Sequence, residues 1–313
     1  MKPEDKGPAP APDAKAVNKG VAPVTYGTGE RPPRGDYSNA RSDYTCDQQW
    51  ERYTGEEHAL YRRLYERQSA QLPGLACEEF IAAVGHLGEA GRIPRFDALS
   101  EKLRKATGWE VVAVPGLIPE EAFFALLADR RFPVTGWLRR PEEFDYIVEP
   151  DVFHDLFGHV PLLFDPMFAD YMQAYGQGGL KASRLHSCEF LARLYWYTVE
   201  FGLIATPAGL RAYGAGILSS AGELRHSVTS PEPQRIGFDL MRIMRTRYRI
   251  DSYQKTYFVI DSYEQLIKAT FPDFTPIYAR LAEQGSLPAG AVQDGDDVQQ
   301  RGTGEGWLDG GDV

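Results

Sequence analysis

Hydrophobic and polar residues follow a helical period over much of the chain. Between Glu56 and Leu72, Leu60 and Leu64 recur at the spacing of one helix face, and polar or charged residues fill most positions between them. Similar patterns predict helices at Cys77–Leu87 and Phe96–Ala106, with Gly or Pro residues between them. We therefore expect three helices before the first strand.

Strand patterns are few and short. The run WEVVAVPG (residues 109–116) is rich in β-branched residues and ends in Pro-Gly, so it predicts a strand, as do FPVTGWL (132–138) and TYFVI (256–260). Pro119 suits the first turn of a helix that continues through EEAFFALLADR. Long helices with few strands predict a mainly α domain with a small β element, and not a doubly wound sheet or a barrel.

The two ends of the chain lack any apolar period. Residues 1–40 are rich in Pro, Gly, Ala and charged residues, and residues 286–313 are rich in Gly and Asp. Segments of this kind bury too little apolar surface to offset the entropy lost on ordering. We therefore expect disorder at both ends and one compact domain over residues 41–285.

The apolar segment FHDLFGHVPLL (residues 153–163) carries two of the six histidines, His154 and His159. In a regular α-helix a separation of five residues turns the second side chain about 140° away from the first. We expect a helix from about Pro150 to end near Gly158, because Gly tolerates irregular backbone and the proline that follows cannot continue a helix. A broken helix could bring both imidazoles to one point; otherwise each is a core histidine that bonds a carbonyl.

A metal held by two histidines needs a further ligand, and the buried helix predicted at Glu189–Leu203 offers one. Glu189 has Arg193 four residues on, which is the spacing of an ordinary helical ion pair. Glu200 has no such partner, and a buried carboxylate is costly unless a positive group compensates it. Two imidazoles and one carboxylate form the facial triad of non-haem Fe(II) oxygenases, which leaves open positions for O2 and a cosubstrate.

The charge of the chain excludes some partners. A net charge of −10 over 313 residues argues against a nucleic-acid-binding surface, which needs a basic footprint. The one local exception contains four arginines among apolar residues, and we interpret it as a solvated face or a set of ion pairs. These arginines are Arg242, Arg245, Arg247 and Arg249.

Cysteines and apolar runs indicate the compartment. Cys46, Cys77 and Cys188 are odd in number and widely spaced, so we expect reduced thiols and neither a disulfide framework nor a zinc site. No run approaches the roughly 18 apolar residues of a membrane span, and the amino end has no apolar region typical of a secretory signal. The expected location is the cytoplasm, with no membrane partner.

Three blocks, EPDVFHDLFGHVPLL, LYWYTVEFGL and AYGAGILSSAGEL, resemble in order and spacing the pterin-dependent aromatic amino acid hydroxylases. The resemblance covers residues 109–270 and extends more loosely back to Tyr53. The chain length is similar to that of the single-domain bacterial phenylalanine 4-hydroxylases. The resemblance implies a mainly helical catalytic basket around a non-haem iron, here over residues 41–285.

The resemblance also implies a role for each matching residue. His154, His159 and Glu200 match the family's iron ligands, the same three residues that the burial argument selects. Arg139 in GWLRRPEEFDY matches the arginine that binds the carboxylate of the amino acid, for which a bidentate guanidinium is suited. The implied substrate-binding residues are Arg139, Trp196, as an aromatic wall, and Ser219.

The run VPGLIPEEAFF resembles the family's pterin loop. Phe123 would stack on the flat pterin ring. Asp155 stands where animal members carry Glu, so its shorter side chain is expected to reach the pterin through a bridging water. Pro119 and Glu120 stand where animal members have serines, so we expect hydrogen bonds to the pterin side chain in this loop to differ from theirs. The implied cofactor-binding residues are the backbone of Gly116, Leu117 and Ile118, together with Phe123, Asp155, Ala192 and Tyr195.

The implied reaction is hydroxylation of L-phenylalanine to L-tyrosine with O2, Fe(II) and a tetrahydropterin such as tetrahydrobiopterin. L-Tryptophan and L-tyrosine remain alternative substrates. Neither end of the chain resembles the regulatory domain or the tetramerising helix of the animal enzymes, so we expect a monomer.

Two other classes of function remain. His154 and Asp155 form an HD dipeptide, as in metal phosphohydrolases, but those enzymes need another histidine upstream, and His86 lies in a different predicted helix. The second alternative is a metal-binding protein without enzymatic activity.

Overall fold

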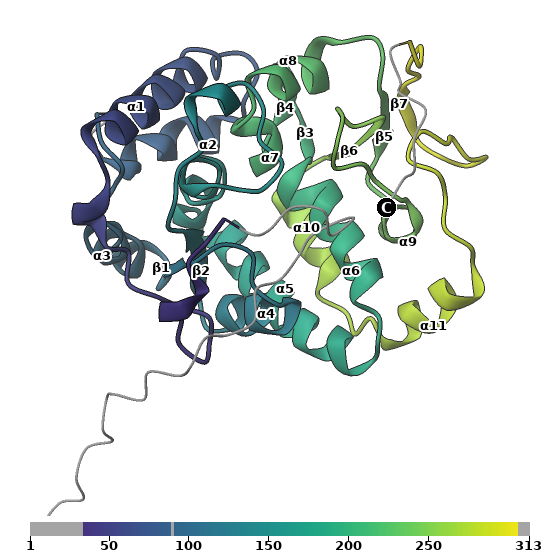
Figure 1. Cartoon of the computed structure of the whole chain (residues 1–313). Coiled ribbons are helices and arrows are strands. Elements are labelled where there is room, and N and C mark those ends of the chain that lie inside the picture. The colour runs from purple at the N-terminus through teal and green to yellow at the C-terminus, as the bar shows by residue number, and fades with distance from the viewer. Residues whose placement is uncertain (1–33, 89–90, 306–313) are drawn as a thin grey trace, which may run out of the picture.

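The computed structural model describes residues 34–88 and 91–305. Figure 1 shows α1, α2 and α3 on one side of the molecule and β5 and β7 on the other. The helices are α1 (Gly55–Ser69), α2 (Glu78–Ala83), α3 (Phe96–Ala106), α4 (Glu120–Ala128), α5 (Pro166–Arg184), α6 (Cys188–Tyr195), α7 (Ala215–Leu218), α8 (Ala221–Thr229), α9 (Leu240–Arg245), α10 (Tyr263–Thr270) and α11 (Thr275–Glu283). The strands are β1 (Glu110–Val114), β2 (Arg131–Thr135), β3 (Leu203–Thr206), β4 (Gly209–Ala212), β5 (Gln234–Gly237), β6 (Thr256–Ile260) and β7 (Val298–Gln300).

The predicted fold class, mainly α with a small β element, is confirmed. The helix expected at residues 96–106 and the strand expected at residues 256–260 have the predicted bounds in α3 and β6. Helix α1 begins where Thr54 and Glu57 form a reciprocal capping box. In the part of the chain that the structure describes, no helix has the length and apolar character of a membrane span.

The strands form two small sheets. Strands β1 and β2 pair in parallel, with α4 as the connection between them. The second sheet has the order β4-β3-β6-β5-β7, in which β6 pairs in parallel with both β3 and β5. Of these five strands the sequence predicted only β6, because the others have three or four residues and no clear alternation.

The expected disordered tail differs from the structure over residues 286–305. Strand β7 pairs antiparallel with β5, and Leu287 and Ala289 are buried. Arg242 Nε donates to Asp296 Oδ1 at 2.9 Å, and both side chains are more than nine-tenths buried. The sparse apolar residues of this segment therefore suffice, because ion pairing and strand pairing add to them. Residues 306–313 lie outside the described residues.

The amino-terminal segment differs from its prediction, whereas the cysteines and the arginine cluster agree with theirs. Residues 34–40, which we expected to be disordered, contain a short 3-10 helix, η1 (Tyr37–Asn39), and residues 1–33 lie outside the described residues. The three cysteines are free, as expected. Arg242 and Arg249 form ion pairs with Asp296 and Asp251, as the ion-pair interpretation of the arginine cluster predicts.

The helix at the two histidines does not end at Gly158, and this prediction was wrong. The backbone instead widens into a π-helical turn, η5 (His154–His159), which contains Gly158. A π-helix bonds residue i to residue i+5, so two residues five apart lie roughly one above the other. A 3-10 turn, η6 (Pro161–Phe164), follows with the proline in its first position. The wider turn, and not a break, removes the angular mismatch between the imidazoles.

A second π-helical turn, η7 (Trp196–Glu200), follows α6 directly, and its last residue is Glu200. The Phe201 N–H donates to the Trp196 carbonyl at 2.8 Å, which closes an i to i+5 hydrogen bond. The predicted helix to Leu203 therefore ends at Glu200, and Leu203 begins β3. Both segments that carry candidate metal ligands are π-helical.

Glycines allow these two turns to approach α7. A Cβ atom on Gly158 would lie 2.7 Å from the Ala215 carbonyl oxygen, and one on Gly214 would lie 2.4 Å from the Glu200 carbonyl oxygen. Such distances are too short for any larger residue, so the backbones touch here. Helix α7 thereby joins η5 and η7 and fixes their separation.

Helices α4 and α5 pack closely through two further glycines, Gly176 and Gly179. A Cβ atom on Gly179 would lie 2.1 Å from the Phe124 ring, whereas one on Gly178 would meet no atom within 4 Å. This contact supports α4, which follows the loop of residues 115–119, against α5, the longest helix among the described residues.

We expect Gly179→Ala to lower the free energy of unfolding by about 1–3 kcal/mol, because the added methyl overpacks the α4–α5 contact. Gly178→Ala is the matched control in the same helix and should raise it by up to about 1 kcal/mol through helix propensity. Urea unfolding monitored by circular dichroism measures both. Equal effects of the two variants would contradict the packing explanation.

Candidate active site

Three side chains converge where the π-helical turns meet. His159 Nε2 lies 3.2 Å from His154 Nε2 and 3.1 Å from Glu200 Oε1, and His154 Nε2 lies 3.7 Å from Glu200 Oε2. Ligand atoms in adjacent positions, each about 2.1 Å from one ion, lie about 3 Å apart, so this spacing fits a single transition metal. The three predicted ligands are thus brought together, although they come from segments more than 40 residues apart in sequence.

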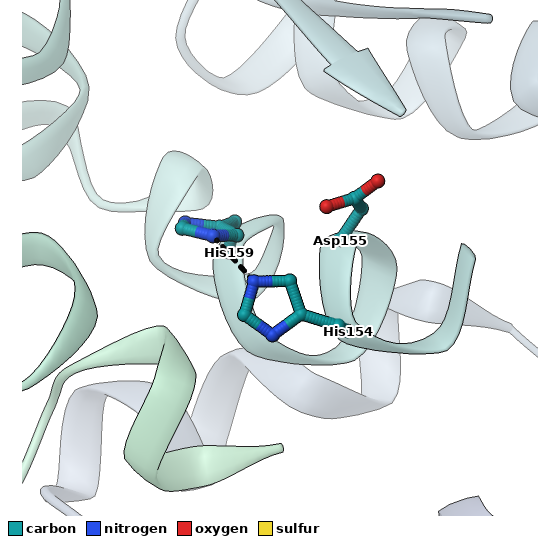
Figure 2. Close-up of side chains that lie close together, drawn as sticks. All are labelled: His154, Asp155 and His159. Atoms are coloured by element: carbon teal, nitrogen blue, oxygen red, sulfur yellow. Dashed lines mark hydrogen bonds between the residues drawn. The ribbon is translucent and has the colours of Figure 1, made fainter. Parts of the chain in front are cut away.

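Asp155 is also close to this group. Ligand atoms of His154, Asp155 and His159 all lie within 4.8 Å of one another. Figure 2 shows the two imidazoles facing each other, with the Asp155 carboxyl group off to one side. Asp155 Oδ2 already accepts a hydrogen bond of 2.7 Å from the Thr135 N–H. Glu200 is therefore the better third ligand, and Asp155 flanks the site.

The pKa shifts of His154 and Glu200 suit metal binding. Burial lowers the pKa of His154 to about 4, although Glu200 opposes this shift, so the imidazole is neutral at pH 7. Burial alone would raise the pKa of Glu200, but His159 and His154 outweigh it, and the carboxyl pKa lies below its ordinary value. Neutral imidazoles and an ionised carboxylate are the states that a metal requires.

Ser219 fixes the orientation of His154. The Ser219 hydroxyl donates to the Ala215 carbonyl at 2.8 Å, so it accepts the hydrogen bond of 2.9 Å from His154 Nδ1–H. This assignment leaves the lone pair on Nε2, which faces His159 and Glu200. The sequence predicted a substrate role for Ser219, which stays a prediction; its contact with a candidate ligand was not foreseen.

Arg139 lies near the same turn. It is buried, with 4% of its surface exposed, whereas its neighbour Arg140 is exposed. Its Nε and Nη2 donate to the two oxygens of Asp151 at 2.8 and 2.9 Å. Asp151 Oδ1 also accepts from the His154 N–H at 3.0 Å, which caps the start of the turn. Asp151 uses the Nε–Nη2 edge of the guanidinium, and no acceptor among the residues that the structure describes bonds Nη1.

Trp196 begins η7 and is held on several sides. Its ring stacks on Tyr248 with a centroid distance of 4.2 Å and an interplanar angle of 14°, and its Nε1–H donates to Gln254 Oε1 at 2.9 Å. The Gln254 backbone N–H in turn donates to Glu223 Oε1 at 3.1 Å, and Tyr257 OH donates to the same oxygen. Burial raises the pKa of Glu223 to about 7.

The candidate cofactor residues lie in three segments around the metal ligands. Phe123 on α4 contacts Tyr195 edge-on at 5.7 Å, and Tyr195 lies over His159 at 6.2 Å. Ala192 is one turn before Tyr195 on α6 and is half-buried. Burial raises the pKa of Asp155 to about 7, although the hydrogen bond from Thr135 opposes this shift.

The loop of residues 116–118 joins β1 to α4. A Cβ atom on Gly116 would lie 3.1 Å from the Tyr37 hydroxyl and 3.2 Å from Glu149 Oε1, so only glycine fits without rearrangement. The side of Gly116 on which a side chain would stand is therefore already occupied by Tyr37 and Glu149. The backbone groups of this loop and the aromatic ring of Phe123 fit a flat heterocycle beside the metal.

Several residues of the site were not predicted. Asp151 was expected only as a helix start, and Glu223 and Gln254 carry no local signal, because their partners are distant in sequence. His86, by contrast, stacks on Phe164 at 4.5 Å and does not reach the metal ligands, so the HD phosphohydrolase alternative lacks its upstream histidine.

Comparisons with known proteins agree with this geometry. The chain matches the family of biopterin-dependent aromatic amino acid hydroxylases over residues 31–280. It is 60% identical to the phenylalanine-4-hydroxylase of Ralstonia nicotianae over 279 residues, which cover 89% of each chain. The expected resemblance is confirmed, and it extends beyond the blocks on which it was based.

Solved structures show the same likeness. The chain resembles phenylalanine hydroxylase from Chromobacterium violaceum with iron and phenylalanine bound, with a TM-score of 0.79 and 58% identity over 82% of this chain and 94% of that chain. It also resembles the cobalt-bound form of that enzyme, with a TM-score of 0.82 and 59% identity over 83% and 94% of the two chains.

We expect Glu200→Gln to abolish stoichiometric Fe(II) binding, because it removes the one anionic ligand of the set. Ser219→Ala should weaken binding by about 10- to 100-fold, since it releases the orientation of His154. Metal content after gel filtration and titration with Co(II) measure both. Glu189→Gln, which replaces the exposed carboxylate that pairs with the buried Arg193 at the start of α6, is the control. Full metal content in Glu200→Gln would refute the ligand assignment.

The raised pKa of Glu223 predicts a pH-dependent stability. A carboxyl with a folded pKa of about 7, above its ordinary 4.5, contributes stability that is complete below about pH 4.5 and is lost as the pH rises through 7. Gln at position 223 cannot ionise, so the Glu223→Gln variant does not lose this stability as the pH rises. Its free energy of unfolding minus that of the unsubstituted protein should therefore increase by up to about 3 kcal/mol between pH 5 and pH 8. Urea unfolding across this range tests the sign; a difference independent of pH would contradict it.

Proposed function

The chain belongs to the biopterin-dependent aromatic amino acid hydroxylases, and from that premise we propose that it hydroxylates L-phenylalanine to L-tyrosine with O2 and a tetrahydropterin at a mononuclear Fe(II). The convergence of His154, His159 and Glu200 is the observation that supports this function best. The phenylalanine-4-hydroxylases among the relatives, and the iron and phenylalanine bound to a similar enzyme, support the choice of metal and substrate.

The protein's share in the reaction is to bind and to orient. When bound, Fe(II) and tetrahydropterin together reduce O2, so that one oxygen atom is added to the aromatic ring and the other to the pterin. His154, His159 and Glu200 would hold the metal, and a set of two imidazoles and one carboxylate would leave coordination positions for O2 and a cosubstrate. Ser219 keeps the Nε2 lone pair of His154 directed at the metal.

Arg139 binds the carboxylate of the amino acid in this proposal. Asp151 holds the guanidinium by its Nε edge, so the arginine is fixed in direction before the substrate arrives, and little side-chain entropy is lost on binding. Trp196 forms a wall for the aromatic ring, and Gln254 and Tyr248 keep that wall in place. The ring thereby faces the metal while the backbone of the substrate stays at Arg139.

Phe123 and the backbone of Gly116, Leu117 and Ile118 bind the pterin in this proposal, with Tyr195 and Ala192 on the side of α6. Asp155 reaches the pterin through a water molecule, because its Oδ2 is already engaged with Thr135. The contact between Tyr195 and His159 supports a pterin position beside the metal ligands.

We further propose a cytoplasmic monomer. The three free cysteines are consistent with a reducing compartment. The net charge of −10 supports a small-molecule substrate and no nucleic-acid partner.

One assay tests the reaction and the substrate together. The Fe(II)-loaded protein is incubated with tetrahydrobiopterin and with L-phenylalanine, L-tyrosine or L-tryptophan, and each product is identified by chromatography. We expect tyrosine from phenylalanine as the fastest reaction, with pterin consumed only when an aromatic amino acid is present. Faster formation of 5-hydroxytryptophan would overturn the choice of substrate, and turnover without pterin would overturn the class of reaction.

A further inference from the structure

The segment Arg34–Ala40, which we call the strap, lies across the loop of residues 115–118. The sequence indicated no role for it, and the proposed function does not use it. Its contacts are with the backbone of that loop and with two residues, Trp137 and Glu143, on either side of Arg139.

The strap rests directly on the loop backbone. A Cβ atom on Gly35 would lie 1.8 Å from the Pro115 carbonyl oxygen and 2.4 Å from its carbonyl carbon, so the strap backbone touches the loop and leaves no room for a side chain. Two residues on, the Tyr37 hydroxyl donates a hydrogen bond of 2.7 Å to the Leu117 carbonyl.

This hydrogen bond fixes the direction of a neighbouring N–H group. The Leu117 carbonyl and the Ile118 N–H belong to one planar trans peptide and point in opposite directions. Because Tyr37 holds the carbonyl toward the strap, the Ile118 N–H points away from it. Among the residues that the structure describes, no protein acceptor bonds this N–H, so it remains available to a ligand.

The first residue of the strap, Arg34, is anchored on the segment that carries Arg139. Arg34 Nη2 lies 2.7 Å from each carboxylate oxygen of Glu143, and the guanidinium carbon lies 4.9 Å from the centre of the Trp137 ring. A charge-assisted contact and a cation–π contact together hold this end. The strap thus ties the loop of residues 115–118 to the segment around Arg139.

The Tyr37 hydroxyl stays protonated, and so remains a hydrogen-bond donor, at neutral and moderately alkaline pH. The side chain is 6% exposed, and burial, together with the Glu149 carboxylate, raises the pKa of its hydroxyl to about 12. The hydrogen bond from this hydroxyl to the Leu117 carbonyl therefore does not depend on pH in that range.

We propose that Tyr37 is a positioning residue for the pterin: its hydroxyl sets the Leu117–Ile118 peptide so that the Ile118 N–H faces the bound pterin ring. The inference rests on the proposed function, which places the pterin on this loop. It adds a residue from outside the expected domain to the determinants of cofactor affinity.

The test uses Tyr37→Phe in the full chain loaded with Fe(II). We expect the dissociation constant for 7,8-dihydrobiopterin, measured by calorimetry without turnover, and the KM for tetrahydrobiopterin to rise by about 3- to 10-fold, the effect of losing one hydrogen bond. The KM for phenylalanine and the iron content should remain unchanged. Gly35→Ala, which pushes the strap off Pro115, should act in the same direction.

Tyr65→Phe is the matched control, because it removes a hydroxyl that bonds a backbone carbonyl, that of Val84, at 3.4 Å and away from the loop. Thermal unfolding separates positioning from stability: a lower midpoint with an unchanged dihydrobiopterin constant in Tyr37→Phe would overturn the inference and leave the proposed function intact. If the unsubstituted protein itself does not bind dihydrobiopterin, the proposed function fails, and this inference fails with it.

Discussion

The close backbone contact of two π-helical turns with α7 is the constraint on which the rest of the site depends. Gly158 and Gly214 carry no side chain at the contact, so η5 and η7 approach one short helix from two sides. The extra residue in each turn then directs His154, His159 and Glu200 to one point. π-Helical turns are uncommon, and they occur preferentially at functional sites, which agrees with their place here.

Buried charges around this contact are connected and not independent. Asp151 accepts hydrogen bonds from the guanidinium of Arg139 and from the backbone of His154, so the residues proposed for substrate and for metal share one carboxylate. Breaking such a buried pair by removing one partner is far more costly than losing an exposed ion pair. The acidic residue that the sequence marked only as a helix start is therefore central to the geometry of the site.

The sequence predicted the composition of the site better than its backbone. Burial and spacing selected His154, His159 and Glu200, because a buried unpaired carboxylate near two imidazoles requires a positive partner. The same reasoning expected a helix break at Gly158, since ordinary propensity rules describe α-helix ends and do not describe a π-helical turn. Gln254 and Tyr37 could not be found in this way, because each acts through a hydrogen bond to a residue distant in sequence.

The position of β7 has a consequence for handling the chain. The sequence placed the end of the folded domain at residue 285, but β7 lies beyond it and covers one side of β5 as the last strand of the five-stranded sheet. A chain shortened to residue 285 would leave the N–H and C=O groups of β5 unpaired along a newly exposed edge. Open edges of this kind are templates for pairing between molecules, so the shortened chain would be prone to aggregation. The Gly- and Asp-rich segment that looks dispensable thus protects the protein from self-association.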